Sequence, residues 1–171
     1  HLFLVLKHID IHTDIEKWLA ELVCQQYFTL KESLRKTLRR PSQNSTDIIS
    51  SQIMCLAEQI TFTGRVEKAM HETTQSLEKF NDELLGGLQK LASLKSSAPS
   101  LHVIKLNALI QDKIHHRDIL NQILSRGQRK HDWLWMKQLR YYISNDAICC
   151  HLEIGTSSLD YSFEYQGNQP K

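Results

Sequence analysis

Apolar residues recur at intervals of three and four along most of the chain, which is the spacing of amphipathic helices. The first such stretch runs from Asp14 to Arg40. Thr13 or Asp14 can cap its start, and Pro41 ends it because proline disfavours helix at the preceding residue. A second stretch runs from Ile53 to Leu91 with an apolar or threonine position about every 3.5 residues. That spacing predicts a long segment packed along a neighbouring helix.

Glycines interrupt the second stretch at Gly64 and at the pair Gly86-Gly87. A glycine in a helix interior costs about 1 kcal/mol relative to alanine. We therefore expect kinks or breaks at these positions.

A connector from Lys95 to Ser100 precedes a third helical stretch, from Leu101 to Leu124, for which Gly127 is a natural C-terminal stop. An aromatic-rich segment from Trp133 to Ile143 follows. Apolar side chains surround this segment almost completely, so we expect it to be buried on more than one side.

After Asn145-Asp146 the spacing of apolar residues changes from 3.6 to 2. Tyr161, Phe163 and Tyr165 alternate with polar residues, and Gly155–Ser158 separate them from the stretch 147–154. This pattern is typical of a β-hairpin.

The pattern as a whole predicts a mainly α fold, an elongated antiparallel helical bundle over residues 1–145 followed by a C-terminal β-hairpin over 146–171. A hairpin alone is marginally stable in water, so its apolar face needs a partner beyond Lys171. The chain begins at His1 and ends without a closing element. We therefore expect it to be a segment of something longer.

Composition adds few constraints: 171 residues with 41% hydrophobic and 23% charged side chains suit one globular domain. With only six glycines and three prolines, a β-sandwich or barrel is hard to build. Cys24, Cys55, Cys149 and Cys150 include no C-x-x-C pair, so reduced thiols in a cytosolic protein fit best. The apolar run Leu2–Leu6 is too short to cross a membrane, and we expect no membrane contact.

Positive charge is concentrated in residues 95–142, where nine Lys and Arg stand against three Asp. A solvated helix face is the plainest interpretation. A basic stripe from Lys105 to Arg140 would also suit a nucleic-acid-binding protein, whose affinity would fall steeply with salt.

The motifs of catalysis and nucleotide binding are absent from the sequence. No glycine lies in a G-x-x-x-x-G-K or G-x-G-x-x-G arrangement, and no serine has a G-x-S-x-G setting. His8 and His12 have helical metal-ligand spacing without an evident third ligand, and the adjacent His115 and His116 point to different faces of a helix. We expect no catalytic, cofactor or metal site in this segment.

Five short sequence segments nevertheless resemble segments of a known protein family. D-W-L-W-M-K-Q-L-R-Y-Y at Asp132–Tyr142 and F-E-Y-Q-G-N at Phe163–Asn168 closely resemble the end of the linker in dynein heavy chains, where it runs into the first AAA+ module. Three earlier segments resemble dynein heavy chain segments that occur in the same order: Ile15–Leu22, Cys55–Glu67 and Lys105–Asp118. Together they extend across most of the chain.

Within that family, E-Y-Q-G-N at Glu164–Asn168 and the adjacent cysteines are most similar to the intraflagellar-transport heavy chain of the cytoplasmic dynein 2 type. The chain departs from the family pattern at two places. The stretch Arg40–Ser51 lacks the aromatic-proline motif of axonemal chains, and the acidic cluster near Asp146 is short. The roles of Cys149 and Cys150 are not indicated.

The resemblance implies a minus-end-directed microtubule motor for retrograde intraflagellar transport, located in the cytoplasm, on the cytoskeleton and in the cilium. Its ATP and magnesium site would lie beyond Lys171, in a ring of six AAA+ modules. Its partners would be that ring, the dynein intermediate and light intermediate chains, and microtubules, with no nucleic acid and no membrane. This segment would be the C-terminal part of the linker, a helical lever with a weak point at Gly86-Gly87.

The resemblance also assigns structural roles to aromatic residues. The side chains expected to pack the root of the lever are Trp133, Trp135, Leu139 and Tyr142. Those expected to form an edge that anchors it to the first module are Tyr161, Phe163 and Tyr165. Lys137 and Arg140 are either solubilising charges or contacts to the ring.

The alternative function is a stand-alone helical scaffold, spectrin-like or coiled-coil. A scaffold has no need of a terminal strand pair with an open aromatic face, so the hairpin discriminates between the two.

Overall fold

The computed structural model describes residues 14–39, 49–97, 99–127, 133–143 and 150–163. Its helices are α1 (Ile15–Arg39), α2 (Ser51–Glu72), α3 (Thr74–Ser97), α4 (Ser100–Ser125) and the short α5 (Trp133–Met136). Its strands are β1 (Arg140–Ile143), β2 (Cys150–Ile154) and β3 (Ser157–Asp160), which form one antiparallel sheet in the order β1-β2-β3.

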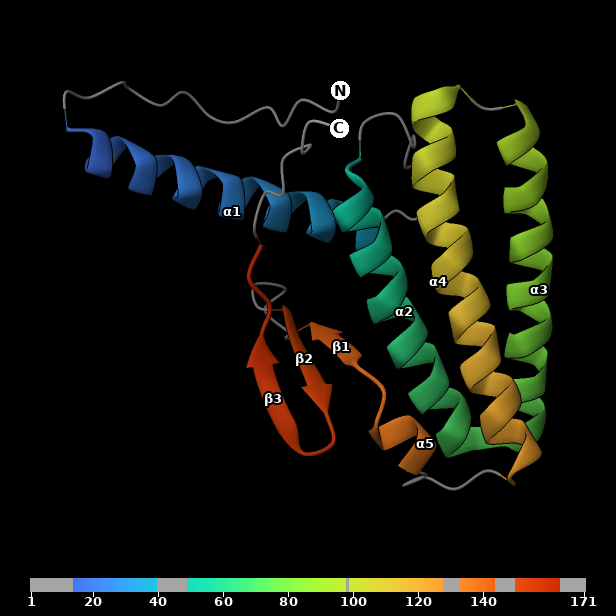
Figure 1. Cartoon of the computed structure of the whole chain (residues 1–171). Coiled ribbons are helices and arrows are strands. Elements are labelled where there is room, and N and C mark those ends of the chain that lie inside the picture. Colours follow the sequence, from blue (N-terminus) through green and yellow to red (C-terminus); the bar gives the residue numbers. More distant parts are fainter. Residues whose placement is uncertain (1–13, 40–48, 98, 128–132, 144–149, 164–171) are drawn as a thin grey trace.

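Helices α2, α3 and α4 lie side by side as an antiparallel bundle, with the sheet beside α2 (Figure 1). Helix α1 crosses near the start of α2, and its N-terminal half extends away from the bundle. The predicted mainly α bundle with C-terminal strands is thus confirmed.

Helix α1 begins at the predicted cap, since Asp14 Oδ1 accepts a hydrogen bond from the Lys17 backbone N–H at 3.3 Å. Its apolar stripe is covered over only part of its length. Leu30 and Leu34 are buried near α2, while Val23 is 62% exposed. The stripe therefore continues past the edge of the bundle.

The chain reverses between α2 and α3 at Thr73, and the expected breaks at Gly64, Gly86 and Gly87 are wrong. Thr73 has extended backbone angles, φ −148° and ψ 161°, and its Oγ1 accepts from the Ser76 backbone N–H at 3.3 Å, which caps α3. All three glycines lie inside continuous helices. Burial of the residues around them outweighs a glycine cost of about 1 kcal/mol each.

The connector before α4 is shorter than expected, because α3 continues to Ser97 and α4 begins at Ser100. The end of α4 agrees with the prediction: the helix stops at Ser125, and Gly127 has a φ of +72°. Only glycine adopts that left-handed conformation at little cost.

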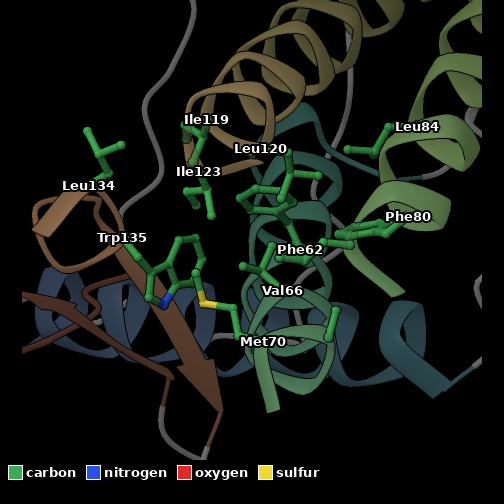
Figure 2. Packing of buried hydrophobic residues seen from close by; sticks show 12 residues of the cluster. Phe62, Val66, Met70, Phe80, Leu84, Ile119, Leu120, Ile123, Leu134 and Trp135 are labelled. Carbon is green, nitrogen blue, oxygen red and sulfur yellow. The ribbon is translucent and has the colours of Figure 1, made fainter. Parts of the chain in front are cut away.

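One hydrophobic cluster, the bundle core, fills the space among α2, α3, α4 and α5 (Figure 2). Its members are Phe62, Val66, Ala69, Met70, Leu77, Phe80, Leu84, Ile119, Leu120, Ile123, Leu134 and Trp135. Figure 2 shows Trp135 reaching from α5 toward Met70 and Val66 of α2. The short helix α5 thereby closes one end of the bundle.

Burial of the aromatic-rich segment is one-sided, in contrast to the prediction. Leu134 and Trp135 are 4% and 3% exposed, while Trp133 and Leu139 are 71% and 43% exposed. The reason is that α5 lasts only four residues and the chain is extended again at Arg140, so only one of its faces meets the bundle.

The strands also differ in position from the predicted hairpin. Residues expected to be helical form β1, so the sheet begins before residue 146, and the third strand ends at Asp160, ahead of Tyr161 and Phe163. The turn at Gly155-Thr156 lies where the sequence placed it, and Gly155 has a φ of +58°. Tyr165 lies outside the described residues.

A second cluster, the junction core, lies where α1, α2 and the residues after β3 meet. Its buried members are Leu30, Leu34, Ile49, Ile53, Met54, Leu56, Ala57, Ile60 and Phe163. Partly buried residues that pack against it are Tyr27, Leu38, Leu109, Tyr141, Ile143 and Tyr161. Helix α2 contributes to both cores.

The two tryptophans of α5 provide a matched test of the packing. Trp135→Ala removes a buried indole and is expected to lower the free energy of unfolding by about 3 to 5 kcal/mol, whereas Trp133→Ala should change it by less than about 0.5 kcal/mol. Urea unfolding monitored by circular dichroism measures both. A loss under about 1 kcal/mol for Trp135→Ala would show that this side chain does not hold the bundle end.

Candidate functional site at the junction of the sheet and the helices

Arg140, the first residue of β1, lies at the centre of the junction between the sheet and α2. Its side chain is buried, and its Nη2 donates to the Gly155 carbonyl at 2.9 Å and lies 3.5 Å from the Glu153 carboxylate. Its Nη1 donates to the Tyr142 hydroxyl at 3.2 Å and lies 4.0 Å from Glu67 of α2. One guanidinium therefore joins β1, β2 and the turn between β2 and β3 to α2.

Glu67 completes this network, because the Tyr142 hydroxyl donates a hydrogen bond to its carboxylate. Burial, followed by the contact with Glu67, raises the pKa of Tyr142 well beyond its usual range. The phenol therefore stays protonated and keeps donating at any physiological pH. The path from Arg140 through Tyr142 to Glu67 links the sheet to the helix with charge-assisted hydrogen bonds.

Backbone contacts hold the same junction. The Thr63 hydroxyl of α2 accepts from the Tyr141 backbone N–H at 3.1 Å and donates to the Gln59 carbonyl at 2.9 Å. The Gly155 backbone N–H donates to the Met136 carbonyl of α5 at 2.7 Å. The sheet is therefore attached to α2 at one strand and to α5 at its turn.

An aromatic series extends the junction from the sheet to α1. Ring centroids lie 6.4 Å apart for Tyr141 and Tyr161, 5.0 Å for Tyr161 and Phe163, and 5.4 Å for Phe163 and Tyr27 of α1, all edge to face. Gln52 of α2 donates to the Tyr161 hydroxyl at 3.2 Å. Three elements are thus joined through the residues that follow β3.

A polar seam joins α2 to α4. Lys113 forms an ion pair with Glu58, both mostly buried, and the ring of His116 stacks on Phe62 with centroids 3.7 Å apart. His116 Nε2 lies 3.0 Å from the Gln59 side-chain oxygen. Burial, assisted by the nearby positive charge of Lys113, lowers the pKa of His116 to about 3, so the imidazole is neutral in the fold.

Cys55 and Asp112 continue this seam. Burial, reinforced by the carboxylate of Asp112, raises the pKa of the Cys55 thiol to about 12. A thiol with so high a pKa is a poor nucleophile, so nothing here supports redox or covalent chemistry at Cys55.

Three residues of the basic stripe make contacts inside the molecule. Lys105 is buried and donates to the Ile49 carbonyl at 2.8 Å, Lys113 pairs with Glu58, and Arg140 holds the sheet. A solvated basic face and a nucleic-acid interface are both wrong for these three residues. Arg140 is therefore not a solubilising surface charge, whereas Lys137 is exposed.

The residues predicted to matter divide into three groups. Trp135 lies in the bundle core, while Arg140, Tyr142, Tyr161 and Phe163 come together at the junction. Trp133 and Leu139 lie at the surface. Tyr165 lies outside the described residues.

Sequence reasoning missed Thr63, Glu67 and His116. Thr63 did carry a signal, because it occupies an apolar position of the α2 series. Glu67 and His116 carried none, since a carboxylate or imidazole on a helix is most often solvated.

The arrangement supports mechanical attachment of the sheet to α2. Within the described residues no three His, Cys, Asp or Glu side chains are placed to share a metal ion. The helices that the structure describes include none with the length and apolar character to span a bilayer.

Comparison with known proteins gives consistent relatives. The chain is 36% identical to cytoplasmic dynein 2 heavy chain 1 of Mus musculus, in an alignment of 173 positions that covers 94% of the chain. It is 34% identical to the Homo sapiens protein of the same name, in an alignment of 175 positions that covers 95% of the chain. It is 25% identical over 163 residues to dynein axonemal heavy chain 12 of Homo sapiens. The matched stretch is 4 to 5% of the length of these relatives. No family model matches the chain.

Removing the guanidinium at the junction tests its contribution. Arg140→Gln leaves Glu67 and Glu153 without their cation and is expected to lower the free energy of unfolding by about 3 kcal/mol. The matched control Arg126→Gln, at an exposed position after α4, should change it by less than about 0.5 kcal/mol. Equal losses for the two variants in urea unfolding would contradict the assigned role of Arg140.

The neutral His116 predicts a pH dependence of stability. Unfolded histidine gains a proton below about pH 6.5, while folded His116 stays neutral down to about pH 3. Its contribution to stability is therefore complete above pH 6.5 and decreases as the pH falls toward 3, by up to about 1.4 kcal/mol per pH unit. His116→Gln should flatten the measured slope between pH 5 and 6, whereas the exposed neighbour variant His115→Gln should retain it.

Proposed function

This chain belongs to the dynein heavy chains, of the cytoplasmic dynein 2 type, and we propose that it forms the C-terminal part of the linker, the lever of the motor. Because it spans about 4% of the length of its relatives, the ATP-driven activity is a property we assign to the longer polypeptide. In that polypeptide ATP and magnesium would bind in the AAA+ ring. The motor would move toward microtubule minus ends in retrograde intraflagellar transport within cilia, with intermediate and light intermediate chains as partners.

The observation that carries the proposal is the buried attachment of the sheet to α2. A lever must pass force from its root to its body without slipping. Here the buried Arg140 and its partner Tyr142 hold the sheet to Glu67 of α2, and Phe163 inserts into the junction core. A load applied at the C-terminal end would be transmitted to α2.

Helix α2 would then distribute this load. It belongs to both cores and contacts α1, α3, α4 and β1. Helix α3, expected to be weak at Gly86-Gly87, is continuous through both glycines. Long antiparallel helices packed at native density resist bending, as a lever requires.

The far end of α1 is consistent with continuation of the lever. Ile15, Leu19 and Val23 form a stripe on its projecting half and are 67%, 45% and 62% exposed. Their spacing of four residues places them on one helix face. We propose that this face packs against further helical structure of the same polypeptide.

A stand-alone scaffold is the second candidate, and the same exposed stripe is the observation that favours it. A scaffold would use α1 to bind a partner and would not need the sheet. The two functions therefore differ in whether the junction matters for activity.

The test places the junction variant in the full-length heavy chain. Arg140→Gln is expected to lower microtubule gliding velocity severalfold while ATP turnover remains near that of the Arg126→Gln control. The physical reason is that a weakened root would let ATP turnover continue while less movement results from each ATP hydrolysed. Gliding velocity equal to the control would contradict the lever and favour the scaffold.

A further inference from the structure

The two edges of the sheet differ in how they are covered. At the β1 edge, the Tyr141 backbone N–H donates to the Thr63 hydroxyl of α2 at 3.1 Å. At the opposite edge all of β3 is exposed, and Figure 1 shows this strand on the side of the sheet away from α2. Among the residues that the structure describes, none forms a backbone hydrogen bond with the outer side of β3.

The strand register identifies which backbone groups of β3 point outward. Along an antiparallel strand, successive residues direct their N–H and C=O groups to opposite sides. Tyr141 donates away from β2, so its partner Leu152 also directs its groups away from β1 and toward β3. Leu152 pairs with Leu159, whose groups therefore point inward. The alternation leaves Ser158 and Asp160 with their backbone groups directed to the open edge.

The side chains at this edge indicate which kind of strand fits beside it. Leu159 is 56% exposed, and Ile154, which the register places on the same face of the sheet, is 45% exposed. Asp160 is exposed on the other face, and residues 143–171 carry four acidic side chains against one basic one. Opposite charges and apolar pairs on neighbouring strands stabilise a sheet. The edge therefore suits a strand with a basic residue beside Asp160 and apolar residues beside Leu159.

We propose that an extended segment of the same heavy chain adds to the open edge of β3 as a fourth strand, with a basic side chain beside Asp160. Its backbone would pair with the outward groups of Ser158 and Asp160. The assignment to the same polypeptide rests on the proposed function, because this chain spans about 4% of the length of its relatives. A strand from the same polypeptide has a high effective concentration, which compensates for the few hydrogen bonds that a four-residue edge offers.

Amide hydrogen exchange tests the added strand directly. The Ser158 and Asp160 amides should exchange at least about tenfold more slowly in the full-length heavy chain than in the 171-residue chain, because only there are they hydrogen-bonded. The Leu159 amide bonds to β2 and is the internal control, with similar protection in both. Mass spectrometry with fragmentation of the β3 peptide gives the single-residue rates. Equal rates at Ser158 and Asp160 in the two chains would overturn the proposal.

Two variants of Ser158 separate strand addition from simple burial of the edge. Proline removes the outward N–H and is tolerated on the open side of an edge strand, whereas alanine keeps that donor. In the full-length chain, Ser158→Pro is expected to abolish the slow exchange of the Asp160 amide, and Ser158→Ala to preserve it. A protected Leu159 amide shows that the hairpin is intact. Slow exchange at Asp160 in Ser158→Pro would overturn the added strand.

Charge reversal at Asp160 tests the side-chain contact without removing a backbone donor. A lysine beside a basic residue repels it. Exchange at Ser158 should therefore be severalfold faster in Asp160→Lys than in Asp160→Asn within the full-length chain, and equal for the two variants within the 171-residue chain. Equal rates in the full-length chain would overturn the basic neighbour.

The origin of the strand is tested on the heavy chain purified without other subunits. Slow exchange at Ser158 and Asp160 in this sample supports a strand from the same polypeptide. Slow exchange that appears only after other subunits are added overturns that assignment. None of these outcomes changes the comparison of Arg140→Gln with Arg126→Gln in gliding velocity, so failure of the added strand is distinguishable from failure of the lever.

Discussion

Every part of this structure depends on one helix that packs against several neighbours at once. Helix α2 meets α1 and the sheet through Ile53 and Leu56, meets α3 and α5 through Phe62 and Val66, and meets α4 through a polar seam. The buried surface of α2 therefore extends beyond the apolar series that the sequence shows, since Met54, Ala57 and Phe62 are buried as well. Because α2 carries both apolar and polar contact residues, the helical bundle and the sheet can both pack on it.

Buried charged side chains help to fix how the sheet and the helices pack around α2. Arg140 and Lys105 are both nearly inaccessible, and each donates to a backbone carbonyl, of Gly155 and Ile49 respectively. Burying a charge costs free energy unless acceptors lie close to it, so these contacts favour the observed arrangement of sheet and helices. Apolar contacts alone would let the sheet slide along α2, whereas hydrogen-bond donors and acceptors at fixed positions resist that movement. That property suits an element proposed to carry load, and it would be unnecessary in a simple connector.

The sequence by itself determined the helical class, the capped start of α1, the turn at Gly155 and the family, because these depend on spacing, on local backbone preference and on words read along the chain. Only the tertiary structure decided that α2 ends at Glu72 and not at a glycine, that Trp135 is buried and Trp133 exposed, and that Arg140, Tyr142 and Glu67 meet. These outcomes depend on which surfaces face one another after folding. Residues 75 positions apart, such as Tyr142 and Glu67, are brought together by the packing of α2 against β1, which local pattern does not encode.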